Sequence, residues 1–134
     1  LSRTMVQRNQ QILSKAFAAF KISHPNKNIL IELHNIIETP ESIELLGGEV
    51  FDKLELTHVV FLQLKPDVLY QQRLNDSGKI RRHSSVSELR ILQEKSKCLC
   101  IETFLSRGLP FKVLESDDEN NISKFLEFIN KRYL

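Results

Sequence analysis

Three short apolar runs, separated by stretches with helical periodicity, constrain the fold of this chain more than any other feature. Each run shows little alternation of apolar and polar residues, which is typical of a strand covered on both faces. Strands that alternate with helices are usually joined by right-handed crossovers into a parallel sheet. We therefore predict an α/β fold with a three-layer α/β/α parallel sheet, whose strands are residues 29–33, 59–64 and 110–114.

Helical patterns flank these runs. Residues 3–20 and 122–133 each carry an apolar stripe at helical spacing, which predicts a first and a closing helix. Ser85 and Glu88 have the spacing of a capping box, in which side chain and backbone bond reciprocally at a helix start. The long helix that this box begins is predicted to end near Gly108.

Two further helices are predicted from proline and glycine. A helix over residues 66–74 begins with a proline, whose missing N–H costs nothing at the first helical position. Thr39 is placed as the N-cap of a shorter helix with Pro40 behind it. We expect that helix to end at Gly47 and Gly48, because glycine tolerates the left-handed conformation of a helix stop.

Length and charge restrict the kind of protein. A chain of 134 residues, 41% hydrophobic and 27% charged, predicts a single folded domain over residues 1–134. Its net charge of +2 is too small to indicate nucleic acid or an anionic membrane as the main partner. No apolar run approaches the roughly 18 residues that a membrane-spanning helix needs, and we predict no signal segment at the start.

The cysteines and histidines indicate neither a disulfide nor a zinc site. Cys98 and Cys100 are two residues apart in a predicted helix, so their side chains point to different faces and cannot easily pair. We therefore expect a reducing, cytoplasmic setting. The four histidines are scattered without the spacing of metal ligands, and zinc is not expected.

The densest polar cluster is the basic stretch over residues 73–83. It lies between two predicted helices, past the C-terminal edge of the second strand, where ligands bind in open α/β sheets. Arginine side chains can hold phosphate oxygens bidentately and stabilise charge on a transferring phosphoryl group. The stretch predicts a phosphate-binding lid over about residues 75–84, which would be the most mobile internal segment without ligand. A solvated basic loop is the alternative.

The end of the first predicted strand carries Glu32 and His34. Glu32 lies between apolar residues, so a buried strand would bury its carboxylate, which then needs a partner. A bound Mg²⁺ is one such partner, and an internal salt bridge or hydrogen-bonded cap is the alternative. His34 by itself fits a structural role better than a catalytic one.

The order and spacing of these motifs resemble archaeal-type adenylate kinases, which are P-loop nucleoside-monophosphate kinases. Residues 29–53, with Glu-Leu-His at the strand end and Thr-Pro behind it, are similar to the third strand and following segment of those enzymes. Residues 73–81 are similar to their hinge and lid, and residues 93–112 align with the helix and strand that follow. The resemblance implies phosphate transfer from ATP to a nucleoside monophosphate such as AMP, with Mg²⁺ as cofactor.

The resemblance also implies roles for individual residues. Arg73 and Arg81 match the arginines that close over the nucleotide phosphates, and they are the implied catalytic residues. Lys79 and Lys97 stand where arginines are expected, so the charge is kept but the bidentate geometry is not. Together with His34 they are the implied phosphate- or nucleotide-binding residues.

Two departures separate the chain from this family. Arg82 stands where the family has an acidic residue, and the P-loop motif Gly-x-x-x-x-Gly-Lys-Ser/Thr does not occur in these 134 residues. The resemblance implies a P-loop strand between the strands at residues 29–33 and 59–64. We therefore expect an incomplete domain, lacking the first strand and the P-loop, that is inactive alone. A missing N-terminal segment or a second chain would supply the loop.

Two other functions remain open. The chain could be a non-catalytic binding or scaffold domain that kept the kinase fold and lost the loop. It could also belong to another P-loop ATPase or small-molecule kinase, because lid arginines are widespread in such folds. Under the kinase hypothesis its partners are ATP and AMP.

Overall fold

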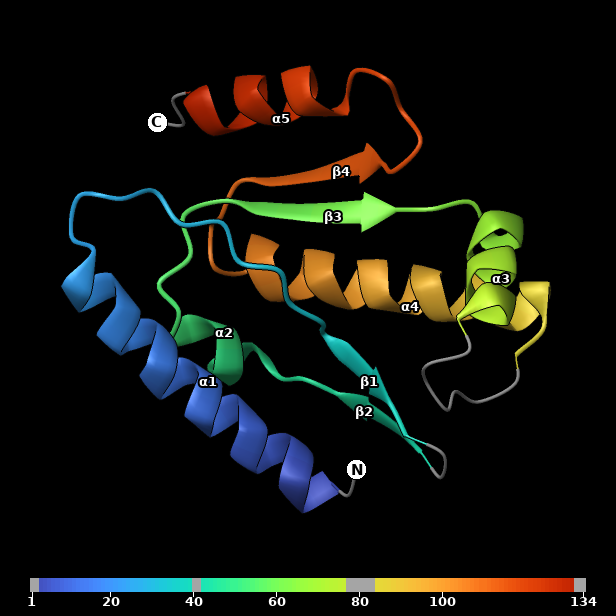
Figure 1. Cartoon of the computed structure of the whole chain (residues 1–134), viewed down its shortest axis with the longest axis horizontal. Coiled ribbons are helices and arrows are strands. Elements are labelled where there is room, and N and C mark those ends of the chain that lie inside the picture. The colour runs from blue at the N-terminus through green and yellow to red at the C-terminus, as the bar shows by residue number, and fades with distance from the viewer. Residues whose placement is uncertain (1–2, 40–41, 77–83, 132–134) are drawn as a thin grey trace. The chain divides into compact units, whose positions relative to one another are not determined.

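The computed structural model describes residues 3–39, 42–76 and 84–131 (Figure 1). The chain divides into two compact units, Leu1–Leu56 and Thr57–Leu134, and each is described by itself. The single domain expected from chain length stays a prediction. Among the described residues, no helix combines the length and the hydropathy needed to cross a membrane.

The first unit consists of two helices and a short hairpin. Helix α1 (Arg3–Ser23) confirms the helix predicted over residues 3–20. Strands β1 (Ile36–Glu38) and β2 (Ile43–Leu45) pair antiparallel, and α2 (Gly48–Asp52) follows them. The buried residues of this unit are Val6, Ser14, Thr39, Leu46, Phe51 and Leu54.

The prediction of a strand over residues 29–33 is wrong, because residues 27–34 form no strand. Leu30 is 81% exposed. An apolar run becomes a strand only if a neighbouring strand takes up its backbone hydrogen bonds, and no described strand pairs with this run. The run therefore has no regular strand pairing among the described residues.

The prediction of a helix from Thr39 to the two glycines is also wrong, because this segment forms the β1–β2 hairpin. The Thr39 side chain accepts a hydrogen bond from the Ser42 N–H at 3.0 Å, and the Thr39 N–H donates to the Ser42 carbonyl at 2.8 Å. Threonine thus caps a turn here and not a helix. Gly47 is the N-cap of α2, where the prediction had placed a helix stop.

The second unit contains the parallel strand pair. Strand β3 (Val59–Gln63) pairs in parallel with β4 (Phe111–Glu115), in a register that sets Val59 opposite Phe111 and Gln63 opposite Glu115. Helices α3 (Pro66–Asn75) and α4 (Val86–Leu105) connect the two strands, and α5 (Asn121–Asn130) closes the unit. These elements confirm the predicted strands at 59–64 and 110–114, their parallel direction and the helices between and after them.

Local signals at both ends of α4 are confirmed. The Ser85 Oγ accepts from the Glu88 N–H at 3.1 Å, and the Glu88 carboxylate accepts from the Ser85 N–H at 3.3 Å, so the capping box is complete. After the helix, Gly108 takes a φ of +67°, a conformation that glycine reaches at little cost. Its N–H donates to the Leu105 carbonyl at 2.9 Å and ends the helix.

The core of the second unit lies between its helices and the strand pair. Helix α4 contacts both strands and α5 contacts β4, on either side of the strands in Figure 1. The rings of His58 and Phe128 meet edge to face, with centroids 5.4 Å apart. The buried side chains of this unit are Leu89, Cys100, Phe104, Leu114 and Phe128.

Both thiols are free, and they differ in environment, with Cys98 exposed and Cys100 buried. Burial raises the pKa of the Cys100 thiol from 9.0 to about 11. Since the thiolate is the reactive form and Cys100 is buried, we expect a disulfide reagent at pH 8 to label the exposed Cys98 first and Cys100 much more slowly. Mass spectrometry of peptides after timed labelling measures the two rates.

Full unfolding in urea is the control for this experiment, because it should make both thiols react at similar rates. Equal rates in the folded protein would contradict the packing of α4.

The raised pKa of Cys100 also affects stability, because the thiol loses its proton at a lower pH in the unfolded chain than in the folded one. The stability from this burial is therefore present below pH 9 and is lost as the pH rises toward about 11.

Candidate functional site

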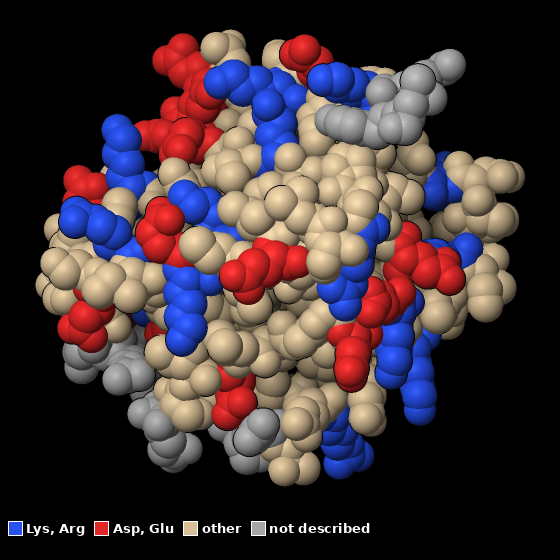
Figure 2. Space-filling view, turned by 180° about the vertical axis from the view of Figure 1, so that it is seen from behind, with Lys and Arg blue, Asp and Glu red and all other residues tan. Residues whose placement is uncertain are grey.

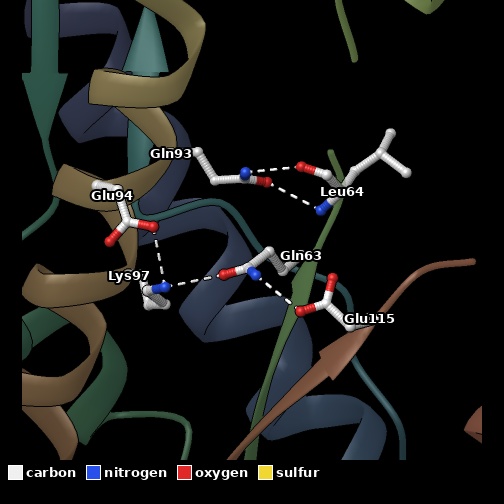
Figure 3. A network of polar contacts seen from close by, with 6 residues as sticks. All are labelled: Gln63, Leu64, Gln93, Glu94, Lys97 and Glu115. Atoms are coloured by element: carbon white, nitrogen blue, oxygen red, sulfur yellow. Dashed lines mark hydrogen bonds and ion pairs between the residues drawn. The ribbon is translucent and has the colours of Figure 1, made fainter. Parts of the chain in front are cut away.

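The carboxyl ends of β3 and β4 bring polar side chains together at one edge of the sheet (Figure 3). Gln63 and Glu115 are the last residues of their strands and lie opposite each other in the register. The Gln63 Nε2 donates to the Glu115 Oε1 at 2.7 Å. In open α/β sheets this edge is the place where ligands bind.

Lys97 of α4 joins this pair to the helix. Its Nζ donates to the Gln63 Oε1 at 2.9 Å and to the Glu94 Oε1 at 2.9 Å, as Figure 3 shows. The Lys97 side chain is only 21% exposed, so its ammonium is held and not freely solvated. An ammonium has three N–H donors, and the described residues use two of them. The third donor has no acceptor among the described residues.

Gln93, one turn before Lys97 on α4, fixes the backbone where β3 ends. Its Nε2 donates to the Leu64 carbonyl at 2.7 Å, and its Oε1 accepts from the Leu64 N–H at 3.0 Å. A side-chain amide thus bonds both polar groups of one residue, as a neighbouring strand would. This pair of bonds ties α4 to the junction between β3 and α3.

The described part of this edge does not carry an excess of positive charge. Lys65 forms an ion pair with Asp117 at 3.5 Å, and the Lys97 ammonium is shared with two neighbours. The carboxylates of Glu94 and Glu115 lie in the same network. A bound polyphosphate would therefore need further cations. On the face drawn in Figure 2, acidic and basic side chains are interspersed, in keeping with the net charge of +2.

The acidic residues after β4 are engaged in local structure. Asp118 accepts hydrogen bonds from the Lys124 ammonium and, at 2.8 Å, from the Asn120 N–H. The bond from Lys124, followed by the one from Asn120, lowers the pKa of the Asp118 carboxyl. This carboxylate organises the start of α5 and is not presented to a ligand.

The structure shows the positions of two of the predicted site residues in the second unit, Lys97 and Arg73. Lys97 stands at the centre of the network described above. Arg73 is half-buried in the last turn of α3, with its Nε atom fully enclosed. Lys79, Arg81 and most of the predicted lid lie outside the described residues. The proposed roles of these residues stay predictions.

Glu32 and His34 lie in the first unit, and both are exposed in the stretch that forms no strand. The expectation that a buried strand encloses Glu32 is therefore wrong. Among the described residues, no three His, Cys, Asp or Glu side chains gather to hold a metal ion. A nucleotide-bound Mg²⁺ needs only one or two protein carboxylates, so the proposed role of Glu32 stays a prediction.

Four residues of the network escaped prediction, namely Gln63, Gln93, Glu94 and Glu115. Two simple signals point to three of them, Gln63, Glu115 and Gln93. A polar residue directly after an apolar run marks the carboxyl end of a strand, which describes Gln63 and Glu115. Gln93 and Lys97 are four residues apart on one helix and therefore share a face.

Comparison with known proteins agrees with the parallel α/β fold. A family model described as an AAA domain matches residues 1–90. This match covers more than half of the chain, which therefore belongs to the AAA domain family, a P-loop NTPase-like, nucleotide-binding group with kinase-like members. The matched region ends before Lys97. No curated protein matches the chain.

Proposed function

We propose that this chain is the nucleotide-closing part of an ATP-dependent kinase that transfers phosphate to a nucleoside monophosphate such as AMP. The observation that carries the proposal is the anchored Lys97 ammonium at the carboxyl edge of β3 and β4, with one donor left for a phosphate oxygen. Helix α3 lies beyond the arrowhead of β3 in Figure 1, so Arg73 belongs to the same unit as this edge. The separate free thiols fit a cytoplasmic protein.

The roles follow from the chemistry of phosphoryl transfer, which depends on positioning and on stabilising charge. Arg73 and Arg81 would bond the oxygens of the transferring group, and Lys79 and Lys97 would neutralise neighbouring phosphates. Mg²⁺ would neutralise developing charge between the phosphates, with Glu32 as a protein ligand. His34 would contact the nucleotide.

The kinase needs a P-loop, which these 134 residues do not contain. The backbone cradle, the lysine and the hydroxyl ligand for Mg²⁺ would come from a preceding segment or a second chain. We expect no phosphate transfer by the 134 residues alone. The basic residues of the predicted lid cannot position a γ-phosphate without the backbone N–H groups of a P-loop. A protein in which a P-loop segment precedes the chain is called the loop-containing protein below.

Lys97→Met in the loop-containing protein tests the binding role. A charge-assisted hydrogen bond to phosphate contributes about 1.5–3 kcal/mol, so we expect ATP to bind about ten- to a hundredfold more weakly. Lys95→Met is the matched control, because Lys95 is an exposed lysine on the same helix. Its substitution should change the dissociation constant less than twofold. Titration calorimetry measures both constants, and melting curves check that both variants stay folded.

Equal effects of the two lysine substitutions would show that the Lys97 network is only structural. ATP binding without turnover in the loop-containing protein would favour a non-catalytic binding or scaffold domain. ATP hydrolysis without transfer to a monophosphate would favour a P-loop ATPase. Transfer to AMP is the result that the proposal expects.

A further inference from the structure

Gln93 holds the residue that directly follows β3 through its backbone alone. The Gln93 amide accepts from the Leu64 N–H at 3.0 Å and donates to the Leu64 carbonyl at 2.7 Å, as Figure 3 shows. A side-chain amide carries one acceptor and two N–H donors, so it can bond both backbone groups of one residue at once. The chain is thus fixed at the point where it leaves the strand.

The same face of α4 also holds the residue before Leu64. Lys97, one turn after Gln93, donates from its Nζ to the Gln63 Oε1 at 2.9 Å. Helix α4 therefore bonds two consecutive residues at the end of β3, one through its backbone and the other through its side chain. Because the two residues share a peptide bond, Gln93 restricts the backbone that carries the acceptor of the Lys97 ammonium.

The Gln63 side chain is engaged at both ends, which makes its position sensitive to the backbone beneath it. Its Nε2 donates to the Glu115 Oε1 at 2.7 Å, and its Oε1 accepts from Lys97. The bond to the Glu115 carboxylate sets which way the amide is turned, so that the oxygen faces the ammonium. A shift of the backbone at the end of β3 would lengthen one of these bonds.

We propose that Gln93 is a positioning residue of the nucleotide site. It touches no phosphate itself and acts through the Leu64 backbone, and then through the Gln63 side chain, on the Lys97 ammonium. Without the Gln93 amide, both backbone groups of Leu64 lose these bonds and the end of β3 is free to shift. The effect on ATP binding rests on the proposed function, whereas the effect on the Lys97 ammonium does not.

Gln93→Met in the 134-residue chain tests this geometry without a nucleotide, because methionine has a similar shape and cannot make the two hydrogen bonds. Amide hydrogen exchange followed by NMR should show the Leu64 amide exchanging faster. Pulsed acylation of lysines, followed by mass spectrometry of peptides, should label Lys97 about three- to tenfold faster, the factor expected for one lost hydrogen bond. Lys95, exposed on the same helix, is the internal reference and should keep its rate. Gln72→Met, at an exposed glutamine of α3, is the matched control and should change neither result.

A double-mutant cycle in the loop-containing protein separates positioning from stability. Gln93→Met should weaken ATP binding about tenfold when Lys97 is present. In the Lys97→Met background it should weaken binding less than about twofold, because the ammonium that it positions is gone. A merely structural role would weaken binding equally in both backgrounds. Titration calorimetry measures the four dissociation constants, and circular dichroism checks that each variant folds.

The two experiments distinguish failure of this inference from failure of the proposed function. If Lys97→Met leaves ATP binding unchanged, the proposed function is wrong, and the labelling rate of Lys97 in the 134-residue chain still decides whether Gln93 positions it. Unchanged labelling of Lys97 after Gln93→Met would overturn the positioning role. Equal losses of ATP binding with and without the Lys97 ammonium would overturn it as well.

Discussion

In the loop-containing protein, Arg81→Ala is expected to lower kcat by on the order of a thousandfold while ATP binding changes far less. An arginine that closes over phosphates acts mainly on the charge that develops in the transition state, so its loss affects turnover more than affinity. A coupled assay with ATP and AMP measures kcat, and calorimetry measures the dissociation constant. Arg81 lies outside the described residues, and its role is proposed from the resemblance of its sequence motif.

Arg82→Ala is the control, because the adenylate kinases that the chain resembles have no cation at this position. It removes an identical charge from the neighbouring position and should lower turnover much less. If the two substitutions have equally small effects, the basic stretch over residues 73–83 is a solvated loop. In that case the catalytic part of the proposed function would be wrong.

Leu89→Ala is expected to lower the free energy of unfolding by about 2–5 kcal/mol. Leu89 is 1% exposed in α4, immediately after the capping box, and its removal leaves a cavity that the surrounding side chains fill only partly. Urea denaturation of the 134-residue chain, followed by circular dichroism, measures the change. The effect is large because a typical domain is stable by only about 5–15 kcal/mol.

Ile91→Ala, two residues further along the same helix, is the matched comparison. Ile91 is 68% exposed, so the same kind of truncation should cost less than about 0.5 kcal/mol beyond any difference in helix propensity. Similar losses for Leu89 and Ile91 would mean that α4 presents a different face to the strands. Such a result would also place Gln93 and Lys97 away from the carboxyl edge.

The helices of the second unit could be predicted well because the sequence features that begin and end them act between residues close together in the chain. The capping box at Ser85, the proline that begins α3 and the glycine after α4 each act over a few residues. The apolar runs over residues 59–64 and 110–114 pair with each other in parallel, as β3 and β4, and their prediction as parallel strands is confirmed.

The candidate site was predicted only in outline. Lys97 was singled out because of the motif order around it, but its partners Gln63 and Glu94 were not. The register of the strand pair sets Gln63 beside Glu115, and the packing of α4 on the strands brings Lys97 to them. Neither follows from spacing along the chain, because the residues involved are up to 52 positions apart.

The amino-acid sequence by itself determined the elements whose stabilising bonds are made within one or two turns, such as α1 and both ends of α4. Only the tertiary structure decided which apolar runs are strands. Residues 29–33 and β3 look alike as sequence, yet one is unpaired and the other is hydrogen-bonded to β4. The physical reason is that a helix satisfies its own backbone groups, whereas a strand depends on a neighbour, and the neighbour of β3 is distant in the chain.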